Sequence, residues 1–185
     1  MRGPWAHENG QVLGCDYFGL RKLQFDVDSF LVIGSYFHGL GAALSVEKPT
    51  ILADPYDGTV KQLDADRDRI IRQRYGMIEK AKRANNFGVI VSTKPGQSNP
   101  QLAITILKHI EDGGKKGVIL YADEVLPQKL LDFIDIDVFV DTACPRLALD
   151  DPERFPKPIL TRDEIMVAVG AWTWEQLLER GLVRL

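Results

Sequence analysis

The sequence predicts an α/β protein made of repeated domains with parallel sheets, one of the domains being truncated. Three observations carry this prediction. Short β-rich runs alternate with longer helical patterns, and the runs are continuously apolar, as is typical of parallel strands covered on both faces. In addition, one block of the sequence recurs 109 residues further along the chain.

The elements follow from these patterns in chain order. The predicted strands are the apolar runs Gln11–Leu13, Phe30–Ile33, Thr50–Ala53, Val89–Val91, Val118–Tyr121, Val138–Val140 and Ile159–Leu160. The longest predicted helix has apolar residues at helical spacing and basic residues opposite, and the next has proline in its first turn and two glycines after it. The predicted helices are Asp68–Ala84, Pro100–Ile110, Leu126–Phe133, Asp163–Val169 and Thr173–Arg180.

Composition limits the function classes. The chain has 185 residues, of which 45% are hydrophobic, and its 23 basic and 26 acidic side chains leave a formal charge of −3. No polybasic field therefore points to nucleic acid or an anionic membrane. The most apolar stretch is too short for a membrane span, no secretion signal is evident, and two cysteines make no disulfide framework. We expect a soluble cytoplasmic protein.

The internal repeat sets the expected domain organisation. Asp28–Val32 aligns with Asp137–Asp141, and at the same offset Lys48-Pro49 aligns with Lys157-Pro158. With a gap of two residues, Gly10–Leu13 also matches Gly117–Leu120. The second copy is preceded by a strand and a helix that the first copy lacks. We therefore expect a partial α/β domain over residues 1–65 and a complete one over residues 66–185.

Both cysteines follow predicted strands. In a parallel sheet the carboxyl ends of strands gather at one edge, where binding sites form, and this would place Cys15 and Cys144 on such edges. Thiolates at such a place can bind soft metals or an iron–sulfur cluster. Two buried structural cysteines are the alternative interpretation. No CxxC pattern supports a zinc ribbon, and the spacing alone does not decide.

Two glycine-containing loops also follow predicted strands. The segment Val91–Asn99 reads as a strand, a turn and a helix start, which presents backbone N–H groups to an anion such as a carboxylate. The segment Gly34–Gly41 is a weaker pattern of the same kind, open to interpretation as an ordinary turn. Arg146 could pair with a substrate carboxylate or make a surface salt bridge.

Several segments resemble the archaeal diphthamide synthase family, the 2-(3-amino-3-carboxypropyl)histidine synthases that begin diphthamide biosynthesis. The most specific is Asp141–Leu147, which reads Asp-Thr-Ala-Cys-Pro-Arg-Leu and is followed by Lys157–Thr161. The others are Gly10–Cys15, Asp54–Tyr56, Gly96-Gln97 and Asp123–Leu130. The resemblance extends from Gly10 to Val169.

The resemblance implies three similar Rossmann-like α/β domains that each give one cysteine to a central 4Fe-4S cluster. It identifies Cys15 as the ligand of the middle domain and Cys144 as that of the last. It further implies a non-standard radical enzyme that cleaves S-adenosylmethionine (S-adenosyl-L-methionine) between sulfur and the γ-carbon. That enzyme is a transferase, which adds the 3-amino-3-carboxypropyl group to a histidine of translation elongation factor 2.

The same resemblance suggests residues for S-adenosylmethionine. We expect Gly96, Gln97 and Asn99 to bind the methionyl carboxylate or amine, with Arg146 nearby. Weaker candidates for the ribose, the adenine or the incoming histidine are His38, Asp54 and Glu124. His38 is also open to interpretation as an ordinary loop histidine.

The chain departs from the family in lacking the first domain and the opening of the second. Two thiols cannot complete a three-cysteine site, so either the sequence is a fragment or the third ligand comes from a separate chain, another residue or a small thiol. The exposed edge should be apolar and favour association, including a dimer or other homo-oligomer. A non-catalytic scaffold subunit that holds a cluster is the alternative function. A different enzyme of similar build, such as quinolinate synthase, is a further alternative, and the Ala-Cys-Pro-Arg-Leu motif argues against it.

Overall fold

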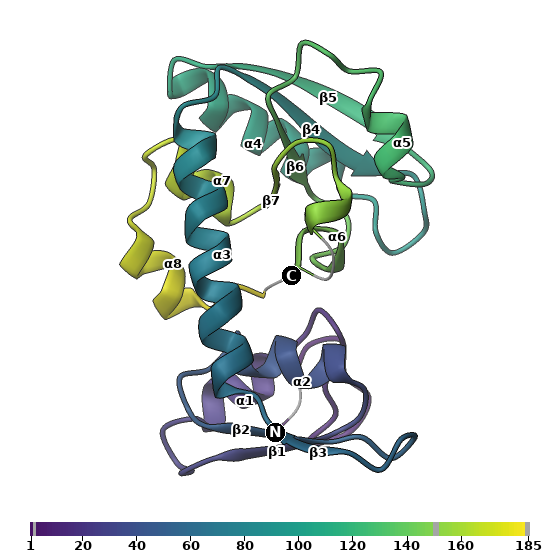
Figure 1. Cartoon of the computed structure of the whole chain (residues 1–185), viewed down its shortest axis with the longest axis vertical. Helices are drawn as coiled ribbons and strands as arrows, with labels where there is room; N and C mark the ends of the chain where they lie inside the picture. The colour runs from purple at the N-terminus through teal and green to yellow at the C-terminus, as the bar shows by residue number, and fades with distance from the viewer. Residues whose placement is uncertain (2, 150–151, 184–185) are drawn as a thin grey trace. The chain divides into compact units, whose positions relative to one another are not determined.

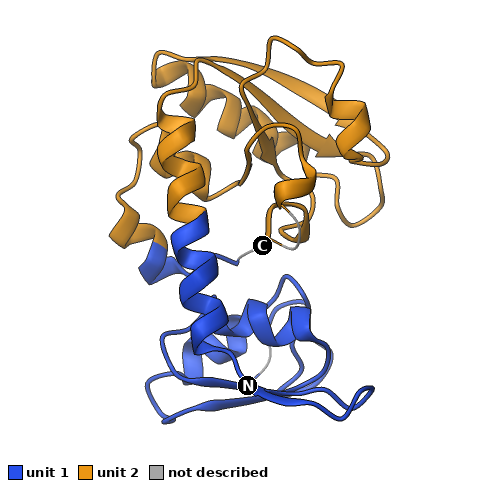
Figure 2. Cartoon of the chain, viewed as in Figure 1, with its two compact units in different colours: residues 1–73, 178–185 blue, residues 74–177 orange. Residues whose placement is uncertain are grey.

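The computed structural model of the chain describes residues 1, 3–149 and 152–183. They form two compact units, Met1–Gln73 with Leu178–Leu185, and Arg74–Leu177 (Figure 2). Each unit has helices packed on a sheet with parallel strands, so the predicted α/β fold class is confirmed. The units divide within the helix α3, Asp64–Lys82, and the C-terminal segment groups with the first unit.

The first unit contains a three-stranded sheet in the order β1-β2-β3 (Figure 1). β1 and β2 pair in parallel, and β3 runs antiparallel to β2. A small core joins the sheet to its helices through Leu52, Leu63 and Ala43. The elements of this unit before α3 are α1 (Phe18–Leu23), β1 (Phe30–Ile33), α2 (Tyr36–Ala43), β2 (Thr50–Ala53) and β3 (Val60–Gln62).

The second unit contains a four-stranded, all-parallel sheet in the order β5-β4-β6-β7. α4 packs against β4 and β5, while α5 and α6 contribute Leu130 and Ala148 to a core that includes Ile90 and Phe139 (Figure 1). The elements are β4 (Asn86–Ser92), α4 (Pro100–Asp112), β5 (Lys116–Ala122), α5 (Pro127–Leu130), β6 (Val138–Asp141), α6 (Arg146–Leu149), the 3-10 helix η1 (Pro152–Arg154), β7 (Ile159–Thr161), α7 (Glu164–Ala168) and α8 (Trp174–Arg180).

The repeat is visible in the strand pairing. Phe30 pairs with Thr50 between β1 and β2, and Phe139 pairs with Ile159 between β6 and β7, so the offset of the sequence repeat carries one register into the other. The residues just before β2 and β7 also match. The N–H groups of Phe30 and Phe139 donate to the carbonyls of Pro49 and Pro158, each at 2.9 Å. β1–β2 and β6–β7 are therefore equivalent pairs.

The predicted strand Gln11–Leu13 is wrong, and with it the match of Gly10–Leu13 to part of β5. Leu13 forms only an isolated bridge to Asp16, which closes a tight turn. Gly10 has a φ of +78°, and a side chain at Gly14 would collide with the ring of Phe37. The glycines therefore serve a turn and a close contact, which a continuous strand does not provide.

The glycine pattern Gly34–Gly41, interpreted as a turn, is largely the helix α2. Its glycines allow close packing: a Cβ at Gly39 would lie 2.8 Å from Leu63, and one at Gly41 would collide with Tyr17. The weak helix propensity of glycine hid the helix in the sequence.

Other differences concern boundaries and short elements. The predicted helix Leu126–Phe133 shortens to α5, whereas α3 begins four residues before its predicted start at Asp68. The exposed strand β3 and the short helices α1, α6 and η1 were not predicted. No helix of the described ranges is both long and apolar enough to cross a lipid bilayer.

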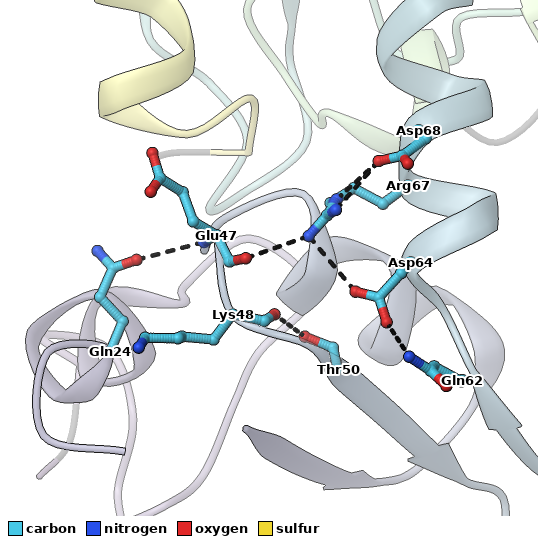
Figure 3. Close-up of polar contacts among 8 residues, drawn as sticks. All are labelled: Gln24, Glu47, Lys48, Thr50, Gln62, Asp64, Arg67 and Asp68. Atoms are coloured by element: carbon cyan, nitrogen blue, oxygen red, sulfur yellow. Dashed lines mark hydrogen bonds and ion pairs between the residues drawn. The ribbon is translucent and has the colours of Figure 1, made fainter. Parts of the chain in front are cut away.

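A polar cluster holds the first turn of α3 in the first unit (Figure 3). Arg67 donates to the backbone carbonyl of Glu47 at 3.3 Å and to Asp68 at 3.1 Å, and its guanidinium lies 3.4 Å from Asp64. The N–H of Glu47 in turn donates to Gln24, at the end of α1, at 3.3 Å. The cluster thus fixes the connection between α2 and β2 against α1 and α3.

A buried ion pair joins four elements of the second unit. Arg74 of α3 and Glu164 of α7 are both 0% exposed, and two guanidinium nitrogens of Arg74 donate to the carboxylate at 2.7 and 2.5 Å. Arg74 also donates to the carbonyls of Ala148 in α6 and Ile159 in β7, each at 2.7 Å. The N–H of Thr161 donates to Glu164 at 2.7 Å. The charges are therefore well compensated inside the protein.

Arg74→Met should destabilise the second unit by about 3–5 kcal/mol, because it leaves the Glu164 carboxylate buried without its cation. The double variant Arg74→Met/Glu164→Met should lose clearly less than the sum of the two single variants. Urea unfolding monitored by circular dichroism measures both. Additive losses would show that the pair is not energetically coupled.

Asp137→Asn should lower the free energy of unfolding at pH 7. The Asp137 carboxylate accepts the N–H groups of Asn86 and Asn85 at 2.9 and 3.0 Å, and these bonds lower its pKa below 3.8. A lowered pKa gives stability that is present above the unfolded pKa and is lost as the pH falls through the folded pKa, so the gap between wild type and variant should narrow as the pH falls below about 4. The exposed Asp132→Asn is the control, and a gap independent of pH would contradict the assignment.

Candidate functional site

Cys144 lies on the segment between β6 and α6 in the second unit. The hydroxyl of Thr142 donates to the carbonyl of Ile90 in β4 at 2.7 Å, which ties the start of this segment to the neighbouring strand. The N–H of Leu147 donates to the Cys144 carbonyl at 3.0 Å, so the first turn of α6 begins there. The thiol is reduced and half-buried. As predicted, this cysteine lies at the carboxyl end of a parallel strand.

Asp141, the last residue of β6, supports the segment that carries Cys144. Its carboxylate is 3% exposed and accepts the N–H of Ala143 at 2.8 Å and that of Cys144 at 3.3 Å. Burial raises the pKa of Asp141 to about 7, although the two N–H groups favour the anion. The two hydrogen bonds fix the backbone that carries the Cys144 thiol.

Cys15 lies in the turn of the first unit that Leu13 and Asp16 close, and not at the end of a strand as predicted. The buried Asp16 carboxylate accepts the N–H groups of Trp5 and Phe18, each at 3.1 Å, and so holds both flanks of the turn. The ring of Phe37 packs on Gly14. The Cys15 thiol is reduced and half-buried.

The two cysteines belong to different units. Over the described parts of the chain, no group of three or more His, Cys, Asp or Glu side chains is arranged to hold a metal ion. Each thiol therefore lies on its own supported turn, and a cluster site needs further ligands from outside either turn.

The predicted anion loop follows β4. Gly96 has a φ of +78°, and the N–H of Gln97 closes a turn onto the carbonyl of Lys94 at 3.1 Å. The Asn99 side chain accepts the N–H of Leu102 at 3.0 Å and so caps α4. Because its oxygen is used in the cap, Asn99 offers a ligand mainly its amide N–H groups.

Glu124 lies on the loop that follows β5, and Arg146 is the first residue of α6, which follows β6. The Glu124 carboxylate lies 4.0 Å from the Lys94 ammonium, so the loops after β5 and β4 meet. Arg146, two residues after Cys144 in the sequence, lines a pocket that also carries a second arginine, Arg154. The pocket is otherwise apolar, and its lining is Val125, Leu126, Pro127, Arg146, Leu147, Arg154 and Phe155.

In the first unit, His38 and Asp54 follow β1 and β2. The Nδ1 of His38 lies 2.8 Å from the hydroxyl of Ser35, the residue before α2. Asp54 accepts the N–H of Tyr56 at 2.9 Å and takes part in the turn between β2 and β3. Asp54 thus has a structural role of its own.

Sequence reasoning missed three residues of these sites. Asp141 stood in the quoted motif without a role, although a carboxylate ending an apolar strand is a recognisable signal of a buried acceptor. No sequence pattern singles out Arg154. The repeat singles out Ser35, because it stands 109 residues before Cys144 and is thus the serine of the first copy at the position of the cysteine in the second.

Comparisons with known proteins agree with one another. Residues 4–178 match the model of the diphthamide synthesis protein family. The chain is 38% identical over 162 residues to the 2-(3-amino-3-carboxypropyl)histidine synthase of Pyrococcus horikoshii, which covers 87% of this chain and 46% of that relative. It is 34% identical over 170 residues to subunit 1 of the synthase of Nematostella vectensis, covering 90% and 36%.

A solved structure of Dph2 from Pyrococcus horikoshii with a 4Fe-4S cluster is also similar. Its TM-score with this chain is 0.79 at 34% identity, over 95% of this chain and 49% of that one. The chain thus spans about half the length of the archaeal proteins it matches, and less of the Nematostella subunit.

Asp141→Ala should speed amide hydrogen exchange at Ala143 and Cys144 by at least about tenfold, because both N–H groups lose their acceptor. Exchange measured by mass spectrometry or nuclear magnetic resonance tests this. Asp123→Ala is the matched control, since that exposed carboxylate accepts the N–H of Glu124 and pairs with Lys129, and holds neither the Ala143 nor the Cys144 N–H. Unchanged exchange at Cys144 would contradict the supporting role of Asp141.

Proposed function

The chain belongs to the diphthamide synthesis protein family, and we propose that it forms part of a 2-(3-amino-3-carboxypropyl)histidine synthase. The activity is the transfer of a 3-amino-3-carboxypropyl group from S-adenosylmethionine to a histidine of translation elongation factor 2. The observation that carries the proposal is the Cys144 turn, a supported thiol at the carboxyl edge of a parallel sheet in a chain 34% identical to a Dph2 with a 4Fe-4S cluster. Such an enzyme is a transferase.

Cys15 and Cys144 are the cluster ligands that this chain provides in the proposal. Their chemistry fits, because iron–sulfur clusters are held by cysteine thiolates and both residues are reduced and partly accessible. The given sequence contains two cysteines, and the proposal takes only these two ligands from it. Three protein ligands leave one iron for the substrate, by the logic of an open catalytic metal site.

The pocket lined by Arg146 and Arg154 is the proposed place for S-adenosylmethionine. A guanidinium at Arg146 can bind the methionyl carboxylate bidentately, and the apolar wall with Phe155 suits the nucleoside. Gly96 and Gln97, on the turn after β4, remain candidates for the amine or carboxylate. Asn99, Glu124, His38 and Asp54 are kept as further candidates, each with the local contact described above.

The chemistry balances with one catalytic electron. When bound, the cluster supplies the electron that breaks the bond between the sulfonium sulfur and the γ-carbon, which gives methylthioadenosine and the 3-amino-3-carboxypropyl radical. The radical forms a carbon–carbon bond with C2 of the substrate imidazole. Loss of one electron and the C2 proton then restores the aromatic ring. In this proposal Arg146 would hold the methionyl carboxylate and so orient the γ-carbon for the cleavage.

Elongation factor 2 as the substrate, a cytoplasmic location and a homo-oligomeric state all belong to this proposal. The presence of two cysteines also favours a second candidate function. In that function the chain is a non-catalytic subunit that holds part of a cluster while another chain performs the reaction.

Anaerobic reconstitution with iron and sulfide distinguishes these functions. For the transferase, the full chain together with the polypeptide that completes it should show thiolate-to-iron absorption near about 400 nm. After reduction with dithionite, it should convert S-adenosylmethionine to methylthioadenosine. Cys144→Ser should lose both signals, while Thr105→Ser, on the exposed face of α4, should keep them.

The outcomes separate clearly. Formation of 5′-deoxyadenosine, or a Cys144→Ser variant with an unchanged spectrum, would contradict the transferase. Iron and sulfide bound through Cys144 without turnover would favour the non-catalytic subunit.

A further inference from the structure

His38 is held at the carboxyl edge of the sheet in the first unit. Its helix α2 follows β1 after Gly34 and Ser35, and the N–H of Gly34 donates to the carbonyl of Ala53 at 3.0 Å, which continues the pairing of β1 with β2. The imidazole packs over Gly34, where an added Cβ would lie 3.7 Å from Nδ1 of His38. This half-buried ring therefore lies at the edge where binding sites form in parallel sheets.

The hydroxyl of Ser35 fixes one nitrogen of this ring. Ser35 Oγ lies 2.8 Å from Nδ1 of His38, and it accepts no backbone N–H of α2 although it stands in the position before the helix. Because the oxygen does not make the usual capping bond, it can accept a hydrogen bond from the ring. In this arrangement Nδ1 carries the hydrogen, and Nε2 is the nitrogen that can take up a proton.

α2 also supports the turn that carries Cys15. The ring of Phe37 packs against Gly14, the residue before Cys15, and a Cβ at Gly14 would collide with it. The rings of Phe37 and His38 lie edge to face, with their centroids 6.0 Å apart. The Phe37 ring thus links the imidazole of His38 to the Cys15 turn within the same unit.

The internal repeat indicates the same place. Ser35 stands 109 residues before Cys144, so it has in the first unit the position that a proposed cluster ligand has in the second. The pairs β1–β2 and β6–β7 share one register, which carries this correspondence into the structure. Where the second unit has a thiol, the first unit therefore has a hydroxyl that holds a histidine.

The other histidines of the sequence lie elsewhere. There are three in all, of which His7 is exposed in the N-terminal segment and His109 is in the last turn of α4, which leads to the amino end of β5. The proposed reaction needs an acceptor for the C2 proton of the substrate imidazole. A histidine suits this task, because imidazole changes its protonation state close to neutral pH.

We propose that Nε2 of His38 is the base that takes the C2 proton of the substrate histidine, and that Ser35 positions it. After the new carbon–carbon bond has formed, the C2–H bond breaks and its proton moves to Nε2. Of the two electrons of that bond and the unpaired electron of the adduct, two complete the aromatic ring and one returns to the oxidised cluster. His38 then releases the proton to solvent. The inference rests on the proposed function, from which it takes the substrate and the reaction.

Nitrogen-15 nuclear magnetic resonance of the full chain tests the contact with Ser35 without iron or S-adenosylmethionine. At a pH where the ring is neutral, His38 should be in the Nδ1–H form. Ser35→Ala should shift the ring toward the Nε2–H form and Ser35→Thr should keep Nδ1–H, because the hydrogen bonds of the ring set its tautomer. An Nε2–H form in the unaltered chain, or a tautomer that Ser35→Ala leaves unchanged, would overturn the proposal.

The reconstituted enzyme, together with the polypeptide that completes it, tests the proton transfer. Methylthioadenosine reports cleavage of S-adenosylmethionine, and modified histidine reports the completed transfer to elongation factor 2. His38→Gln should still form methylthioadenosine, but the modified histidine formed per methylthioadenosine should fall by at least about tenfold, as expected for the loss of a general base. Ser35→Ala should lower this ratio less, and Ser35→Thr should restore it.

The matched control is His109→Gln, which changes a half-buried histidine of α4 and should keep the ratio of the unaltered enzyme. Circular dichroism and the unfolding midpoint check that His38→Gln folds. An unchanged ratio in His38→Gln would overturn the proposal. Loss of methylthioadenosine in that variant would do so as well, since it would place His38 in the binding of S-adenosylmethionine.

Failure of this proposal and failure of the proposed function are distinguishable. If the unaltered enzyme forms no methylthioadenosine, the proposed function is contradicted and this inference with it. If the unaltered enzyme forms both products and His38→Gln forms them in the same ratio, the proposed function stands and only the role of His38 is contradicted.

Discussion

A parallel β-sheet requires cover on both faces, and most of this structure follows from that constraint. The second unit satisfies it with α4 on one side and α5 and α6 on the other, so β6 and β7 are buried throughout. The first unit repeats the same strand pair in the same register but covers only one side. Because the two copies share one pattern, the exposed face of the first sheet has a physical explanation and is not ordinary surface variation.

The same parallel pairing determines where the candidate site lies. The loops after β4, β5 and β6 leave the sheet at the same edge, and they carry the Gly96 turn, Glu124 and Cys144 respectively. Asp141 then holds the backbone before the thiol, and Arg74 holds the carbonyl of Ala148 at the far end of α6. A short helix with weak intrinsic stability is thereby fixed at both ends by buried polar groups.

The sequence allowed the buried strands and the two long helices to be predicted, because continuous apolar runs and amphipathic periodicity are strong signals. It did not allow α2 to be predicted, since Gly39 and Gly41 lower helix propensity and their packing against Leu63 and Tyr17 is a tertiary effect. The strand predicted before Cys15 was wrong for a related reason. Val12 and Leu13 have the composition of a strand, whereas the turn depends on the contact of Phe37 with Gly14, which the sequence does not reveal. The Cys144 turn was predictable from its motif, but the support from Asp141 requires the fold.

The ion pair between Arg74 and Glu164 has a consequence for how the chain folds while the ribosome synthesises it. The partners are 90 residues apart in the sequence, and the guanidinium also needs carbonyls from α6 and β7. While the ribosome is still producing the chain, α3 emerges long before any of these acceptors, and a dehydrated guanidinium without them is unfavourable. The second unit therefore cannot close around Arg74 until α7 has been synthesised, which makes the burial of this side chain a late step of folding.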